Sequence, residues 1–233
     1  MLLDIKSSSI LLTLTRGKLT KLEDHDPVLL DMVNKEWTKM GQTSKLNCFV
    51  MQGENKQSNA FVTSGKLVIY DTMFEHIPKR EHLMAIIRHE MGHAIKNHIP
   101  KIVVARLLYY NLLFIGMAFL VLYKEKWLPM FGITYNSVFL ALFGVMHFIH
   151  FKTAYYVYNI CEHTIQRQFE FDCDEFSAET GDDKGAQEIK DSLMIMFYKN
   201  KLDFYTDRLY SKFKNHHPTL QERVDALTPN SNA

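Results

Sequence analysis

The sequence predicts a mainly α-helical protein with one small antiparallel β-sheet and a hairpin of two apolar helices. Three observations predict this fold class. Apolar residues recur at helical spacing within residues 83–95, three short runs of strand composition lie between residues 46 and 70, and two long apolar stretches follow residue 106. With 233 residues, 47% of them hydrophobic, the chain can form one sizeable core, and we expect a single domain over residues 1–233.

Residues 18–77 are expected to hold an N-terminal helix and the sheet. The residues up to about Lys21 show no period and are expected to be irregular. From Pro27, with Asp26 as the cap, apolar residues recur every three or four positions and predict a helix. The runs of strand composition are residues 46–51, 59–63 and 66–70, with a polar loop over residues 53–58.

Residues 78–101 are expected to form a helix that carries the motif His89-Glu90-Met91-Gly92-His93. Pro78 suits the first turn of this helix, and Pro100 is expected to kink or end it. Residues four apart on a helix lie one above the other, so both imidazoles can share one Zn²⁺. Glu90 is then close enough to act as a base on a zinc-bound water. Coincidence is the alternative, and a third ligand would decide between them.

Glu170 is the candidate third ligand, in the segment Arg167-Gln168-Phe169-Glu170-Phe171-Asp172-Cys173-Asp174. On a helix Asp174 lies one turn after Glu170, so Glu170 can complete a His₂Glu site while Asp174 orients one of the two histidines. A solvated acidic face is the alternative interpretation. Cys173 is either a further thiolate ligand or, as we favour, a small buried side chain.

Residues 103–160 are expected to form a transmembrane helical hairpin. Residues 107–123 are 17 residues without a charge and would rise about 26 Å as a helix. A second stretch runs over residues 137–151 and resumes over residues 154–160. A pair of buried helices in a soluble enzyme is the alternative. Basic residues favour a cytosolic active site, because five lie on the side of the zinc motif (Lys96, Lys101, Arg106, Lys152 and Arg167) against Lys124 and Lys126 in the connection.

Residues 161–228 are expected to hold the Glu170 helix and the C-terminal helices. Gly181-Asp182-Asp183 ends the first of these, and residues 186–198 form an amphipathic helix. Residues 199–215 lack a clear period and are expected to be a connection that covers the substrate. Pro218 is expected to start the last helix, and the residues after Pro229 are expected to be disordered.

Composition narrows the function classes. A formal charge of +1 gives no argument for nucleic acid, and we expect no such partner. The cysteines Cys48, Cys161 and Cys173 are odd in number and lack C-x-x-C spacing, which argues against a disulfide framework and fits a reducing compartment. The first residues show no signal peptide, so internal spans are expected to bring the chain into a membrane.

Three motifs in this order resemble the integral-membrane zinc metalloproteases that include the type 1 CAAX prenyl proteases and the HtpX-type bacterial proteases. They are the His89–His93 motif, the Arg167–Phe171 segment with Asp174 and Ala178, and His217-Pro218-Thr219-Leu220-Gln221-Glu222-Arg223. The resemblance covers roughly residues 18–227 and implies a zincin-like (gluzincin) metalloprotease core with one Zn²⁺ per chain. The prenyl proteases carry several more membrane helices ahead of the zinc motif than the residues before Pro78 can supply, so we expect a shortened member.

The resemblance implies a role for each site residue. Three residues bind the metal: His89, His93 and Glu170. Glu90 is the general base, and His217 hydrogen-bonds the tetrahedral oxyanion. Arg223 pairs with a site carboxylate, and Asp174 supports a ligand histidine.

The resemblance also implies the substrate and its binding mode. Asn59 and Ala60 lie on an edge strand to which a peptide adds as a further strand, although a plain turn at Asn59 is the alternative. The implied reaction removes the last three residues of proteins with a prenylated C-a-a-X end, at the endoplasmic reticulum, with membrane lipid as a further partner. The alternatives are an HtpX-like membrane-protein quality-control protease and a non-catalytic membrane scaffold that keeps the fold.

Overall fold

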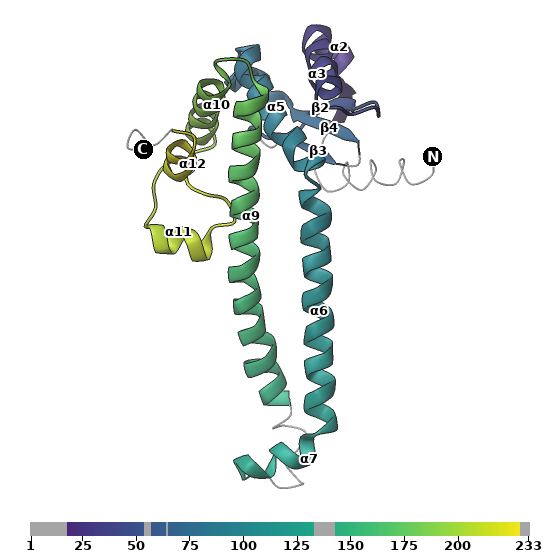
Figure 1. Cartoon of the computed structure of the whole chain (residues 1–233), viewed down its shortest axis with the longest axis vertical. Coiled ribbons are helices and arrows are strands. Elements are labelled where there is room, and N and C mark those ends of the chain that lie inside the picture. Colours follow the sequence, from purple (N-terminus) through teal and green to yellow (C-terminus); the bar gives the residue numbers. More distant parts are fainter. Residues whose placement is uncertain (1–17, 54–56, 64, 133–142, 229–233) are drawn as a thin grey trace. The chain divides into compact units, whose positions relative to one another are not determined.

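The computed structural model describes residues 18–53, 57–63, 65–132 and 143–228 (Figure 1). The chain divides into two compact units. The first comprises the residues up to Asn97, Phe169–Asp207 and the residues from Pro218 onward. The second comprises His98–Gln168 and Arg208–His217.

The first unit contains a mixed four-stranded sheet in the order β1-β2-β4-β3. The strands are β1 (Lys18–Lys21), β2 (Asn47–Gln52), β3 (Ala60–Thr63) and β4 (Lys66–Tyr70). The outer pairs are antiparallel, but β2 and β4 are parallel. The prediction of an antiparallel sheet was therefore wrong for the central pair. Since β3 takes the edge, residues 53–65 supply the crossover of about a dozen residues that parallel neighbours need.

Strand β1 corrects a second expectation, because residues up to Lys21 were predicted to be irregular. Lys18–Lys21 pair with β2 and form one edge of the sheet. This strand has four residues and carries a lysine at each end, which suits an edge strand that must not pair further. A run this short has too few alternations to stand out in the sequence.

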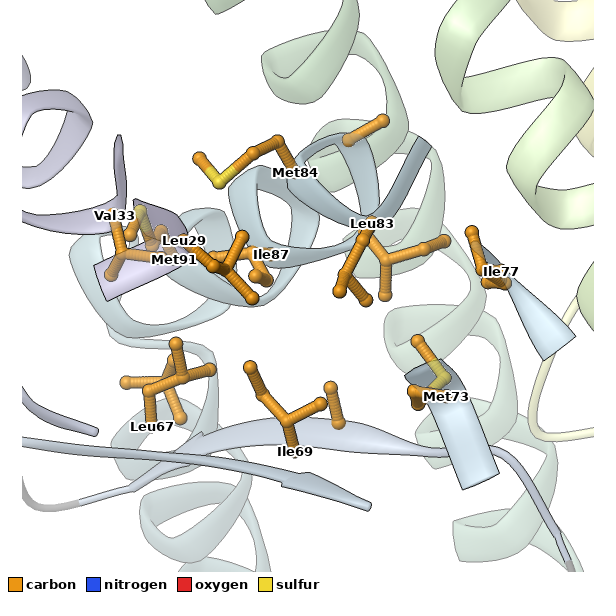
Figure 2. Close-up of a cluster of buried hydrophobic side chains, with 14 of the residues drawn as sticks. Leu29, Val33, Leu67, Ile69, Met73, Ile77, Leu83, Met84, Ile87 and Met91 are labelled. Atoms are coloured by element: carbon orange, nitrogen blue, oxygen red, sulfur yellow. The ribbon is translucent and has the colours of Figure 1, made fainter. Parts of the chain in front are cut away.

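The core of the first unit lies between the sheet and α5 (Arg80–Ile95). Figure 2 shows Leu67 and Ile69 of β4 facing Leu83, Ile87 and Met91 of α5. The same cluster includes apolar residues of α2 (Leu22–His25), α3 (Pro27–Lys39) and α4 (Asp71–His76). The zinc motif is thus carried by a helix whose opposite face is fixed in the core.

The start of α3 agrees with the sequence prediction, whereas the end of α5 does not. Helix α3 begins as predicted, with the Leu29 N–H donating to the Asp26 side chain at 3.0 Å. Helix α5 ends at Ile95, before Pro100, and Asn97 takes a left-handed conformation with φ 55°. The expectation that Pro100 kinks or ends the zinc helix was wrong, since Pro100 lies in the first turn of the following helix, where proline is tolerated.

Three further helices complete the first unit. They are the part of α9 (Lys152–Thr180) from Phe169 onward, α10 (Gly185–Lys199) and α12 (Leu220–Ala226). Ser177 of α9 donates a hydrogen bond to the carbonyl of Ala85 on α5 at 2.7 Å. Helix α12 starts two residues after Pro218, because Thr219 and Glu222 form a reciprocal capping box.

The second unit is built on α6 (His98–Leu122), a helix of 25 residues. Its most apolar window has a mean hydropathy of 1.8 and is 6% buried, and among the described residues it alone is long and apolar enough to cross a membrane. Arg106 of α6 donates to Glu162 in the early part of α9 at 2.9 Å. The second stretch of the predicted hairpin starts at residue 137, outside the described residues, so the hairpin as a whole stays a prediction.

Besides α6 and the part of α9 up to Gln168, the second unit contains shorter helices. They are α7 (Lys124–Trp127), the 3₁₀ turn η1 (Pro129–Phe131), the π-helix η3 (Val145–Phe151) and α11 (Arg208–Lys214). The last of these corrects the expectation of an irregular connection over residues 199–215. Arg167 holds α11 by donating to the buried Ser211 hydroxyl at 2.9 Å, a partner 44 residues away that local periodicity cannot reveal.

Candidate metal centre

Three side chains of the first unit bring their donor atoms together. The Nε2 atoms of His89 and His93 lie 3.1 Å apart. Glu170 places Oε2 3.5 Å from Nε2 of His89 and Oε1 3.6 Å from Nε2 of His93. Ligands at about 2.0–2.1 Å around a tetrahedral Zn²⁺ lie roughly 3.4 Å from one another. The three separations are therefore close to the ligand–ligand distances around such an ion.

The donor chemistry also fits a divalent cation. His89 and Glu170 are buried, with 5% and 7% exposure, so water does not satisfy these polar atoms. Two imidazoles and one carboxylate are N and O ligands that zinc accepts, and three protein ligands leave one position of a tetrahedron open. His89, His93 and Glu170 are thus a cluster that could hold a metal ion.

Asp174 fixes the ring of His89. Its Oδ1 lies 2.9 Å from Nδ1 of His89, so this nitrogen donates the hydrogen bond. The other ring nitrogen, Nε2, is thereby directed to the donor triangle, which consists of the donor atoms of His89, His93 and Glu170. The sequence left open which histidine Asp174 contacts, and the structure places it at His89. Burial alone would raise the pKa of Asp174, but Arg223 and His89 outweigh burial and hold that pKa below its ordinary value.

Arg223 joins the two buried carboxylates. It donates to Asp174 through Nε at 2.7 Å and through a terminal nitrogen at 2.5 Å, and its other terminal nitrogen lies 3.3 Å from Glu170. Its exposure is 5%, so the guanidinium is compensated by these carboxylates rather than by water. The pairing predicted between Arg223 and a site carboxylate is therefore present in the geometry, with two carboxylates instead of one.

The pKa of His89 is raised by the carboxylates beside it. Burial would lower the pKa of His89, but the hydrogen bonds to Asp174 and Glu170 raise that pKa to about 10. The ring is therefore protonated near neutral pH, and a cation that binds there must displace a proton.

Glu90 and Gly92 lie between the two motif histidines on α5. The Glu90 side chain is half-buried. Burial would lower the pKa of Arg223, but the charges of Asp174, Glu170 and, less strongly, Glu90 outweigh burial and raise that pKa. A Cβ at Gly92 would lie 3.0 Å from Phe176 Cδ1 and 3.2 Å from Cys173 Sγ, so α5 and α9 approach closely here. Burial raises the pKa of the Cys173 thiol well above its usual value, which agrees with a small buried side chain.

Two polar contacts around the motif were not predicted. Arg88, next to His89, is buried and pairs with Glu188 of α10 at 2.7 Å. Lys96, at the end of α5, donates to the carbonyl of Asp172 at 2.6 Å. Both contacts join residues at least 76 positions apart, and the sequence carries no local signal for such pairs.

The other residues predicted for the site are Asn59, Ala60 and His217. Asn59 is exposed and Ala60 is 3% exposed, at the start of the edge strand β3. His217 belongs to the second unit, where its residue is exposed and its carbonyl accepts a hydrogen bond from Arg167 at 3.4 Å. The catalytic role of His217 stays a prediction.

A helix with two histidines four residues apart, packed on a small sheet and joined by a glutamate from a later helix, defines the zincin-like class of metallopeptidase folds. Residues 25–230 match Peptidase family M48, and the chain belongs to this family.

Relatives of known name agree with the family. The chain is 28% identical to a CAAX prenyl protease 1 homolog of Oryza sativa over 77% of this chain and 42% of the relative. It is 26% identical to the Arabidopsis thaliana homolog over 91% of this chain and 49% of the relative. The crystal structure of S. mikatae Ste24p matches with a TM-score of 0.69 at 22% identity, over 91% of this chain and 51% of that one. The chain thus spans about half the length of the relatives it matches, and the structural match shows the fold alone.

Proposed function

We propose that the protein is a zinc-dependent membrane endopeptidase whose metal is held by His89, His93 and Glu170. The observation that carries the proposal is the cluster of donor atoms, in which the Nε2 atoms of His89 and His93 lie 3.1 Å apart and 3.5 and 3.6 Å, respectively, from the two carboxylate oxygens of Glu170. Zinc, when bound, supplies a Lewis acid that polarises the scissile carbonyl and makes water acidic near neutral pH. One such ion per chain is expected.

The other side chains of the site each have a proposed role in the reaction. Glu90 takes a proton from the attacking water and delivers it to the leaving amine. Asp174 and Arg223 keep His89 and Glu170 oriented through the contacts described above. We assign His217 to hydrogen-bond the oxyanion, as the motif it begins suggests.

The peptide is proposed to bind along the edge strand β3. Asn59 and Ala60 begin this strand, and backbone hydrogen bonds to an edge bind a peptide independently of its side chains. Ala60 is buried, so entry of a peptide requires a small opening at this edge.

The proposed substrates are proteins with a prenylated C-a-a-X end, from which the last three residues are removed. The relatives named CAAX prenyl protease 1 support this assignment, as does the C-terminal segment from His217 to Arg223. We place the protein in the membrane of the endoplasmic reticulum with its site facing the cytosol. The apolar helix α6 supports a membrane location, and the five-to-two excess of basic residues supports the orientation. The choice of the endoplasmic reticulum rests on the resemblance to the prenyl proteases alone.

The test is cleavage of a farnesylated peptide by the full chain in detergent micelles. We expect release of the C-terminal tripeptide, loss of release with a zinc chelator, and recovery on adding Zn²⁺. Cleavage of unfolded membrane proteins but not of the farnesylated peptide would instead favour a quality-control protease. Zinc binding without turnover of either substrate would leave a non-catalytic scaffold.

A further inference from the structure

The exposed large hydrophobic residues of the first unit are concentrated in one segment. Among the described residues of this unit, Val28 is the exception, and the others lie within twelve positions: Met194, Tyr198, Leu202, Phe204 and Tyr205. Their exposure ranges from 45% to 74%. Soluble surfaces seldom gather large apolar side chains in one place unless that place binds something.

A pocket of about 590 Å³ opens within this segment. Its apolar walls include Met194 and Tyr198 of α10, Phe204, and Leu220 of α12. Two nitrogen-bearing side chains complete it, His76 of α4 and Lys199 at the end of α10. The described lining contains no acidic residue, so a carboxylate would meet a cation and no repelling charge there.

The pocket adjoins the residue that precedes the predicted peptide-binding edge. Ser58 hydrogen-bonds through its hydroxyl to Nδ1 of His76, which lines the pocket. The backbone N–H of Ser58 donates to Oδ1 of Asn200 at 2.8 Å, and its carbonyl accepts from Nδ2 of Asn200 at 2.8 Å. Asn200 directly follows Lys199, so one segment both lines the pocket and pairs with Ser58.

This pairing occupies the outer edge of the sheet at Ser58. The Tyr70 N–H donates to the Asn59 carbonyl, so the backbone groups of Asn59 face β4 while those of Ser58 and Ala60, one residue to either side, face away from it. The Asn200 amide therefore takes the place that a residue of an added strand would take. The Ala60 N–H donates to Oδ1 of Asn59 at 3.0 Å, so a peptide pairing with Ala60 must displace this side chain, and it cannot continue along the edge past Ser58. In the more stable antiparallel arrangement, the end that stops there is the carboxyl end of the peptide.

We propose that this pocket receives the carboxyl-terminal residue of the peptide substrate, with an apolar side chain inside and the terminal carboxylate at Lys199. The assignment rests on the proposed peptidase function and specifies its substrate class as peptides with a free, apolar carboxyl terminus. The end of α10 carries the partial negative charge of the helix dipole, so binding of a carboxylate depends on the lysine side chain rather than on the helix. A bilayer surface needs neither the concave pocket nor the pairing at Ser58.

The experiment measures binding, so that it does not depend on turnover. The full chain with Glu90→Gln is titrated, in micelles and in lipid nanodiscs, against fluorescein-labelled farnesylated octapeptides that end in methionine as the free acid or the carboxamide. We expect the acid to bind about fivefold more tightly, the effect of one solvent-exposed ion pair. Adding Lys199→Gln should weaken binding of the free-acid peptide to the level of the carboxamide peptide. The affinity of the carboxamide peptide should stay unchanged. Lys184→Gln is the matched control, since this exposed lysine lies at the other end of α10.

A second variant tests the shape of the pocket. Met194→Trp fills it and should weaken peptides that end in methionine about tenfold more than peptides that end in alanine, because a large side chain no longer fits. Thermal unfolding of each variant checks that the fold is intact.

The other outcomes distinguish a failure of the pocket proposal from a failure of the peptidase proposal. An unchanged preference for the acid in Lys199→Gln overturns the pocket, and so does a loss that is seen only in nanodiscs, which assigns the surface to the membrane. If the wild-type chain cleaves no peptide while binding still depends on Lys199, the pocket stands and the peptidase proposal fails. If cleavage is normal and binding ignores the carboxyl terminus, the reverse holds.

Discussion

The two units place charged and apolar side chains in opposite ways. In the first unit Glu170, Asp174 and Arg223 are buried and compensate one another. In the second, α6 leaves large apolar residues such as Leu112 and Phe114 exposed, at 68% and 59%. The charged side chains of the first unit compensate one another, whereas the exposed apolar side chains of α6 would be covered by the hydrocarbon of a bilayer if α6 spans one, as we propose. A substitution that is harmless in one unit should therefore be damaging in the other.

The largest effect is expected from Glu90→Gln in the first unit. Loss of the base should lower kcat about a thousandfold, within the range for general acid–base catalysis, while bound zinc stays unchanged. Cleavage rates and metal analysis of the same preparation measure both quantities. Full activity in this variant would remove the proposed mechanism.

Arg223→Met tests the mutual compensation of the buried charges. It leaves Asp174 and Glu170 without their cation and should lower the free energy of unfolding by about 3–4 kcal/mol. Arg223→Lys keeps the charge but not the fork to Asp174, so the loss should be smaller. Denaturant unfolding measures both variants. Equal stability of wild type and Arg223→Met would show that these contacts do not hold the site.

Leu112→Lys tests the second unit, with Val28→Lys as its match in the first. Leu112 lies near the middle of α6 and Val28 lies on α3, and both are exposed. A lysine at mid-membrane costs about 2.5–3.5 kcal/mol, whereas an exposed site in water tolerates it. We expect the fraction of chain resistant to carbonate extraction from membranes to fall for Leu112→Lys alone. An equal result for both variants would place α6 in water.

The pKa of His89 predicts how metal binding depends on pH. Because that pKa is raised to about 10 in the metal-free chain, binding must release a proton over the neutral range. Zinc affinity should rise up to about tenfold per pH unit between pH 6 and 8, measured by competition with a chelator of known affinity. The proton contributes to stability below the ordinary histidine pKa and this contribution is lost as pH rises toward 10. A flat profile would contradict the assigned protonation.

The smallest effect is expected at the cap of α3. Asp26→Ala removes the bond to the Leu29 N–H and should lower the free energy of unfolding by about 1 kcal/mol without changing zinc content. The Asp26 pKa is held below its ordinary value by the backbone and Arg80, which together outweigh burial. This stabilisation is therefore present above the unfolded pKa and is lost as pH falls through the lowered value. Thermal unfolding at pH 7 and pH 3 measures the difference.

The sequence predicted the elements that depend on the spacing and composition of neighbouring residues. The cap at Asp26, the helix through His89 and His93, and the runs that form β2, β3 and β4 follow from spacing and composition. The parallel pairing of β2 with β4 could not be predicted, because the same runs allow either direction. Neither could α11, whose seven residues are too few for a period.

The candidate site divides in the same way. The motifs predicted which residue types gather, but not that Asp174 contacts His89 rather than His93, since both histidines lie one helical turn apart. The pairing of Ser58 with Asn200 spans 142 positions, and nothing in the sequence around either residue predicts it. Tertiary packing decides such contacts, and a single sequence does not record them.

Zinc content of the purified chain tests the central claim most directly. Metal analysis should give one zinc per wild-type chain, a value well below one for Glu170→Ala after dialysis, and one for Glu179→Ala, an exposed glutamate on the same helix. Zinc near zero in the wild type, or full zinc in Glu170→Ala, would contradict the account.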